Sequence, residues 1–181
     1  MNRYKLKFTR LQNEIFRLIC IKAGESLNQR EIAKKLNVSP TAIAKALQDL
    51  EKRGLVLNKK DKTMNLNLVE LNRDKEGVIN LKRIENLKMF YESGVVNYLE
   101  EKFPGSVIIL FGSYSYGEDT TQSDIDIAII GCKEKEMNLD KFEDLFEKEI
   151  RINFYESFGK IHKHLRSNIF NGIVLSGRIG L

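Results

Sequence analysis

The sequence has few of the features that mark membrane-bound or disulfide-stabilised proteins. It contains no stretch of about eighteen apolar residues, so no membrane-spanning helix is expected. The amino terminus, MNRYKLKFTR, lacks the apolar core of a signal peptide, which predicts a cytoplasmic protein with no membrane partner. Cys20 and Cys132 lie far apart in apolar stretches, without the CxxC spacing of a metal or redox site. Both are expected to be buried thiols.

Prolines are equally scarce, and both mark predicted boundaries. Pro40 follows Ser39 at the start of a predicted helix, and Pro104 precedes Gly105 at the end of another. Neither an internal repeat nor a low-complexity segment is present. With 42% hydrophobic residues, the 181-residue chain can bury one moderate core or two small ones, and two compact domains are predicted.

Charge divides unevenly between the two halves of the chain. Residues 1–75 hold 17 Lys and Arg against 8 Asp and Glu, a balance of +9, whereas the remainder hold 13 against 17, a balance of −4. A cationic module favours a polyanionic partner, because neutralising phosphates is the main favourable term in nucleic-acid binding. Double-stranded DNA is therefore the expected partner of the first half. A basic surface that is merely solvated is the alternative.

Three helices are predicted in the first half, over residues 9–22, 29–36 and 39–53. Ser39-Pro40 is the strongest start signal, since serine satisfies a free N–H group and proline has none to lose. Two segments of alternating polarity, LVLNKK and TMNLNLVEL, then predict two strands joined by a turn.

This order of three helices and a two-stranded wing resembles the winged helix-turn-helix of transcription regulators, and SPTAIAKALQDLEKRGLV is similar to the recognition helix. In that family the third helix enters the major groove and the basic wing touches the DNA backbone. The resemblance implies that Thr41 and Lys45 reach base edges. It implies phosphate contacts for the wing lysines, which are Lys59, Lys60 and Lys62. Protein contact or formation of a homodimer is the alternative use of such a module.

A helical connector is predicted over residues 75–104, between a domain of residues 1–74 and a domain of residues 105–181. Apolar residues at helical spacings predict two helices in the connector. The helices are expected to meet near Ser93-Gly94.

The acid pair Asp124 and Asp126 has the clearest chemistry in the sequence. The apolar strand SVIILF ends at Gly112-Ser113, and DIDIAII follows after a polar loop, where strand alternation puts both carboxylates on one face. Two carboxylates so close together repel each other unless a cation binds between them. Oxygen ligands beside a triphosphate suit Mg²⁺, with Mn²⁺ as a substitute. The glycine and serine are expected to approach the phosphates.

The spacing of Gly-Ser, ten residues and Asp-x-Asp resembles the signature of minimal nucleotidyltransferases of the DNA polymerase β superfamily. The resemblance implies a small mixed sheet flanked by helices, so that the whole chain is α+β. It also implies two-metal phosphoryl chemistry that transfers a nucleoside monophosphate, with AMP from ATP favoured, to an acceptor hydroxyl. Relatives of minimal size include antitoxins that modify a toxin, so the expected acceptor is a partner protein.

Two positions depart from the pattern of that superfamily. Tyr116, which is predicted to bind the nucleotide, stands where many relatives have a basic residue. A later strand, EIRINFY, lacks the third carboxylate that relatives carry beside the first two. Asn153 best matches the missing acid, and Glu149 and Glu156 are candidates to replace it. The alternative function is therefore a transcription regulator whose transferase fold is weakly active or inactive and senses nucleotide.

Overall fold

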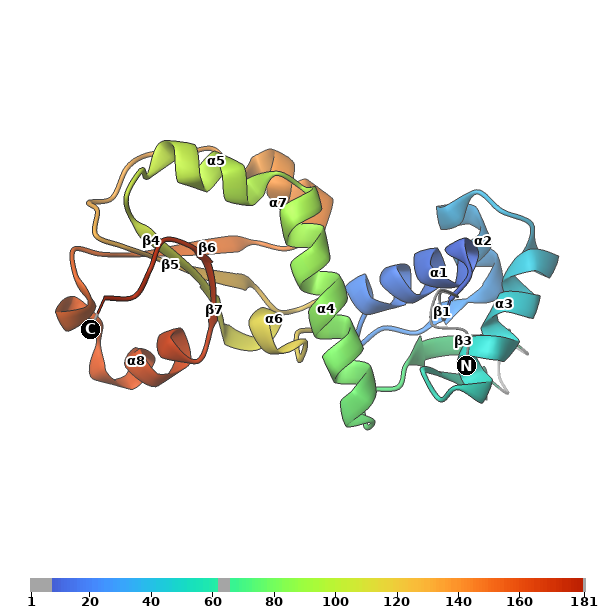
Figure 1. The fold of residues 1–181 in the computed structure, drawn as a ribbon. Helices are drawn as coiled ribbons and strands as arrows, with labels where there is room; N and C mark the ends of the chain where they lie inside the picture. Colours follow the sequence, from blue (N-terminus) through green and yellow to red (C-terminus); the bar gives the residue numbers. More distant parts are fainter. Residues whose placement is uncertain (1–7, 62–65, 181) are drawn as a thin grey trace, which may run out of the picture. The chain divides into compact units, whose positions relative to one another are not determined.

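The computed structural model of the chain describes residues 8–61 and 66–180. Contacts within the chain divide it into two units, Met1–Val78 and Ile79–Leu181. Figure 1 labels the helices and strands of both units. No helix within the described ranges combines the length and the apolar character that crossing a bilayer requires.

The first unit contains α1 (Arg10–Ile21), β1 (Leu27–Asn28), α2 (Gln29–Leu36), α3 (Pro40–Lys52), β2 (Val56–Asp61) and β3 (Leu66–Leu71). Strand β3 lies between β1 and β2 and pairs antiparallel with both. Three helices followed by the β2–β3 hairpin confirm the predicted winged helix-turn-helix. The wing turn is predicted at Asp61-Lys62; Asp61 is the last residue of β2, and Lys62 lies outside the described residues.

Local capping explains where these helices begin. Reciprocal capping boxes start α1, at Thr9 and Gln12, and α2, at Asn28 and Glu31. Helix α3 begins with the predicted serine cap and proline. The inward faces of the three helices then form the core of the unit, with the side chains of Ile15, Ile19, Cys20, Ile32, Ile43, Leu47 and Leu50 buried.

The second unit contains most of α4 (Glu76–Glu92), followed by α5 (Val95–Lys102), β4 (Val107–Phe111), α6 (Gly112–Tyr116), β5 (Ile125–Ile130), α7 (Asp140–Phe146), β6 (Ile150–Tyr155), η1 (Phe158–Lys160), α8 (Lys163–Phe170) and β7 (Ile173–Ser176). Its sheet has the strand order β6-β5-β4-β7. Strand β4 is antiparallel to β5 and β7, whereas β5 and β6 are parallel. The predicted mixed sheet flanked by helices is confirmed.

Helices cover both faces of this sheet (Figure 1). One face packs against α4, α5 and α7 through a cluster that includes Phe90, Leu99, Phe142, Phe146, Ile108, Leu110, Ile125, Ile127 and Ile129. The other face packs against α8 through a smaller cluster that includes Ile109, Phe111, Ala128, Ile130 and Ile169. The two helices of the predicted connector, α4 and α5, thus contribute to the core of the second unit.

Candidate functional site

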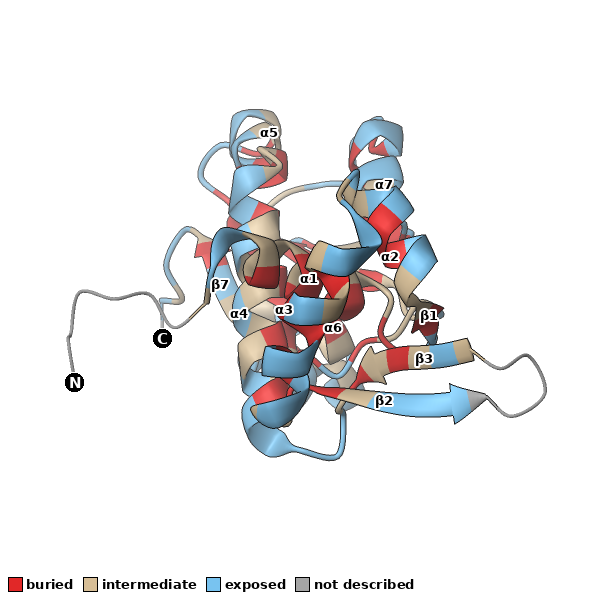
Figure 2. Ribbon diagram, turned by 90° about the vertical axis from the view of Figure 1, so that its right-hand side faces the viewer, coloured by how far each residue is buried: buried red, intermediate tan, exposed pale blue. Residues whose placement is uncertain are grey.

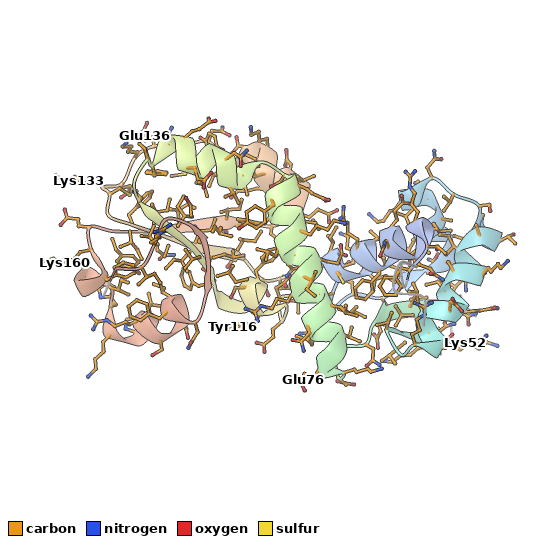
Figure 3. All side chains as sticks on the ribbon, in the orientation of Figure 1. Lys52, Glu76, Tyr116, Lys133, Glu136 and Lys160 are labelled. Carbon is orange, nitrogen blue, oxygen red and sulfur yellow. The ribbon has the colours of Figure 1, made fainter. Side chains whose placement is uncertain are left out.

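The turn after β4 brings the chain backbone against an acid. Gly112 has a φ of +72°, and a Cβ atom added to it would lie 2.5 Å from Oδ2 of Asp126. Phe111, the residue before this glycine, pairs with Asp126 across β4 and β5. Only glycine fits this position without moving the carboxylate. The short helix α6 begins here and ends at Tyr116, which is labelled in Figure 3.

The two acids stand at the start of β5. Asp126 lies within the strand, and Asp124 immediately precedes it. Ile125, Ile127 and Ile129 point to the opposite face, and all three are fully buried, as the alternation predicts. Burial raises the pKa of the Asp126 carboxyl, and repulsion from Asp124 raises that pKa further. The site is therefore a partly buried anionic pair at one end of the sheet.

The parallel strand β6 places an arginine beside this pair. Arg151 pairs with Asp126, and its Nη1 atom lies 2.7 Å from Oδ2 of Asp124. Its Nε atom donates to Oε1 of Glu149 at 3.2 Å. The hydrogen bond to Glu149 and the charge of Asp124 raise the pKa of the guanidinium. The positive charge also opposes the rise in the pKa of Asp126.

The pairing of β5 with β6 also shows where the predicted substitutes for a third carboxylate lie. Asn153 pairs with Ala128, one step further along the same face of the sheet than Arg151. Glu149 binds the arginine, and Glu156 lies beyond the end of β6. Within residues 8–61 and 66–180, no three His, Cys, Asp or Glu side chains form a group that fits a metal ion. Two carboxylates do suit one Mg²⁺, which takes its remaining ligands from phosphates and water.

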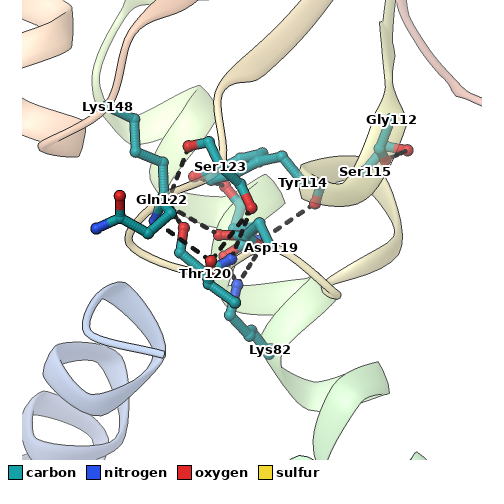
Figure 4. Close-up of polar contacts among 10 residues, drawn as sticks. Lys82, Gly112, Tyr114, Ser115, Asp119, Thr120, Gln122, Ser123 and Lys148 are labelled. Carbon is teal, nitrogen blue, oxygen red and sulfur yellow. Dashed lines mark hydrogen bonds and ion pairs between the residues drawn. The ribbon is translucent and has the colours of Figure 1, made fainter. Parts of the chain in front are cut away.

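A buried polar cluster supports the loop that leads into Asp124 (Figure 4). The Lys82 ammonium is fully buried and forms an ion pair with Asp119, which is itself 1% exposed. Asn86, one turn further along α4, donates to Oδ1 of Asp119 at 2.7 Å and to the Tyr114 carbonyl at 3.0 Å. The cluster thereby fastens the loop to α4 and α6.

Lys148 completes the cluster from the segment before β6. Its Nζ atom lies 3.4 Å from Oδ2 of Asp119, and it donates to the carbonyl oxygens of Thr120 and Ser123. The carbonyl of Ser123 belongs to the peptide bond that joins Ser123 to Asp124. The cluster therefore fixes the backbone immediately before the acid pair.

Comparison with known proteins assigns the second unit to a family. Residues 92–175 match the family described as "Nucleotidyltransferase domain". A protein of Methanocaldococcus jannaschii named "Putative protein adenylyltransferase" is 35% identical, in a match that covers 34% of this chain and 81% of that protein. The chain belongs to the nucleotidyltransferase family. The Gly112 turn and the acid pair at the start of β5 lie within the matched residues of this nucleotidyltransferase domain.

The first unit matches a second family. Residues 12–63 match the MarR family, so this unit is a MarR-type winged helix. The adhesin competence repressor of Streptococcus pyogenes is 26% identical, with a TM-score of 0.43 over 54% of this chain and 69% of that chain. ZitR of Lactococcus lactis is 22% identical, with a TM-score of 0.44 over 57% and 67%. MepR of S. aureus, in a complex with DNA, is 17% identical, with a TM-score of 0.39 over 52% and 77%.

Four of the five predicted DNA-contacting residues lie on exposed parts of the winged helix. Thr41 and Lys45 are exposed on α3. Lys59 and Lys60 are exposed towards the end of β2, which is coloured pale blue in Figure 2. Lys59 also forms an ion pair with Glu70 of β3. The third of the wing lysines, at position 62, lies outside the described residues.

Sequence reasoning missed the residues that contact or support the acid pair from other parts of the chain. The alternation of EIRINFY puts Arg151 on the polar side of its strand, but nothing in the sequence predicts that it lies beside the acids. Lys82 and Asn86 stand one turn apart on α4 and one turn before the buried Phe90, so they interrupt an inward stripe. Polar residues at such positions are a signal of a buried polar pair. Asp119, in a loop rich in polar residues, carries no such signal.

Proposed function

We propose that the protein is a DNA-binding nucleotidyltransferase that transfers AMP from ATP to a hydroxyl group on a partner protein. The observation that carries the proposal is the pair Asp124 and Asp126 at the start of β5, where Asp126 faces the tight turn at Gly112. The relative from Methanocaldococcus jannaschii supports AMP as the transferred group and protein as the acceptor class, because it is named "Putative protein adenylyltransferase".

Different residues of this chain would bind the metal ion and the nucleotide. Asp124 and Asp126 would hold one Mg²⁺, which would neutralise charge on the triphosphate. The backbone at Gly112 and the Ser113 hydroxyl would contact phosphate oxygens, and Tyr116 would donate a hydrogen bond to the nucleotide. The acceptor oxygen then bonds to the α-phosphorus while the bond to the β-phosphate oxygen breaks. Pyrophosphate leaves with that electron pair, and the hydroxyl proton passes to water.

Transfer of label from ATP tests this function. The full chain is incubated with Mg²⁺, a cell lysate and ATP labelled at either the α- or the γ-phosphorus. Label from the α position is expected on protein and label from the γ position is not, since pyrophosphate leaves. Asp126→Asn should abolish the transfer, because one anionic metal ligand is lost. Asp144→Asn, at an exposed acid of α7, is the matched control and should retain it.

Two results would contradict the transferase proposal. Transfer of the γ label would identify a different phosphoryl reaction, and α label that persists in Asp126→Asn would place the reaction elsewhere. CTP, GTP and UTP labelled at the α-phosphorus establish the base preference in the same assay.

The winged helix is proposed to bind double-stranded DNA. Helix α3 would enter the major groove with Thr41 and Lys45 at base edges, and the wing lysines would contact phosphates. The excess positive charge of residues 1–75 supports this role. A homodimer would present two such helices to half-sites about one helical turn apart. Light scattering with and without a duplex tests the dimer.

A transcription regulator that only senses nucleotide is the second candidate, and Arg151 favours it. A guanidinium beside Asp124 supplies positive charge but no metal ligand. A regulator of this kind would bind MgATP and change its affinity for DNA without transferring label. DNA affinity measured with and without MgATP therefore separates it from the transferase.

A further inference from the structure

A guanidinium lies directly beside the acid pair, on the strand where the resemblance implies a third metal-binding acid. Arg151 is the β6 residue that pairs with Asp126, and it reaches Oδ2 of Asp124 at 2.7 Å. Glu149 accepts a hydrogen bond from its Nε atom, so carboxylates hold the guanidinium from two sides. One of the oxygen atoms that a metal ion would use is thereby occupied.

The chemistry of arginine limits what this site can bind. A guanidinium has five N–H donors and no acceptor, and it does not lose its proton in proteins. Arg151 therefore offers no ligand to a cation and repels one. The formal charges agree, since one divalent cation and Arg151 balance the three carboxylates of Asp124, Asp126 and Glu149. Without a bound triphosphate, a second divalent cation would leave an excess of positive charge on these groups.

We propose that Arg151 substitutes for the second divalent cation, so that the Asp124–Asp126 pair binds one metal ion per nucleotide. This inference rests on the proposed function, because it assumes that the acid pair binds a metal–nucleotide complex. It departs from the two-metal arrangement that resemblance to the DNA polymerase β superfamily implies. The guanidinium acts as a fixed monovalent charge beside the metal and is set in place by the parallel register of β5 and β6.

Counting bound Mn²⁺ tests the proposal without measuring catalysis. The full chain is titrated with Mn²⁺ at a saturating concentration of an ATP analogue that has a methylene group between the α- and β-phosphorus. Electron paramagnetic resonance measures the free Mn²⁺, and the analogue without protein gives the background. The wild-type chain is expected to hold about one ion, whereas Arg151→Asp, which places a third carboxylate beside the acid pair, should hold about two.

Arg151→Asp both removes a positive charge and adds a carboxylate ligand, and Arg151→Gln separates these two effects. Glutamine removes the guanidinium charge without adding a carboxylate, so the number of bound Mn²⁺ ions should stay at about one. Affinity for that ion should rise by up to about fivefold, the factor expected from an exposed ion pair. Arg10→Gln is the matched control, since Arg10 forms an exposed ion pair with Glu14 at 2.8 Å in the first unit. It should change neither quantity.

Three results would overturn the inference. They are two Mn²⁺ bound by the wild-type chain, one Mn²⁺ bound by a folded Arg151→Asp, and no gain in affinity in Arg151→Gln. Circular dichroism reports whether Arg151→Asp folds. If it does not fold, the results for the wild-type chain and Arg151→Gln decide whether the inference stands. Asp126→Asn distinguishes the two levels of failure. Unchanged Mn²⁺ binding in that variant would refute the proposed site itself.

Discussion

Replacing Asp119 with asparagine should strongly destabilise the second unit. Asp119 supplies the negative charge that faces two buried ammonium groups, those of Lys82 and Lys148. With the wild-type aspartate the three side chains carry a formal charge of +1, and Asp119→Asn raises it to +2. Removing one partner of a buried ion pair costs about 3–5 kcal/mol, because the remaining charge is left uncompensated.

The opposite substitution, Lys82→Met, should cost much less. The formal charge of the cluster falls to zero, and Asp119 keeps Lys148 at 3.4 Å and its hydrogen bond from Asn86. Methionine fills most of the buried space of the lysine stem. The expected loss is about 1 kcal/mol, the usual net contribution of a hydrogen bond.

Amide hydrogen exchange of the full chain measures both effects within the second unit. Peptides covering β4 and β5 report the free energy of opening there, so the unfolding of the winged helix does not confuse the result. Asp144→Asn is the control and should change the free energy by less than about 0.5 kcal/mol. Equal losses of opening free energy in Asp119→Asn and Lys82→Met would refute the charge argument. They would show that packing alone determines the stability of the cluster.

Three further predictions concern the nucleotide site and the winged helix. Gly112→Ala should weaken MgATP binding about tenfold in calorimetry, because a Cβ atom there displaces the Asp126 carboxylate. Gly105→Ala, at a similar φ of +80° with open space around it, should leave that affinity unchanged, and equal losses would contradict the reasoning. Replacing the wing lysines with alanine should weaken binding to all duplexes alike and lower the log–log salt slope by about 0.9 per lost phosphate contact, as measured by fluorescence anisotropy. Lys45→Ala should instead relax discrimination at one base pair by about 1–3 kcal/mol, and uniform weakening across sequences would show that Lys45 contacts only phosphate.

Local signals in the sequence determined most of the elements and their order. Capping residues and periodic apolar positions predicted α1, α2 and α3, because a helix is specified by contacts three and four residues apart. The apolar run before Gly112 and the alternation after Asp124 likewise predicted β4 and β5. The acid pair needed no tertiary information, since the two residues stand two apart at the start of one strand and alternation puts them on one face.

Only the tertiary structure decided which residues surround that pair. Arg151 and Asn153 lie on the same face of β6, and shifting the strand by two residues would exchange them without exposing the isoleucines. The alternation therefore could not say which of the two stands beside Asp126. The ion pair between Lys82 and Asp119 joins residues distant in sequence, and no local pattern specifies it. Strand register and buried charge pairs depend on how whole elements pack, whereas caps and alternation depend only on neighbours along the chain.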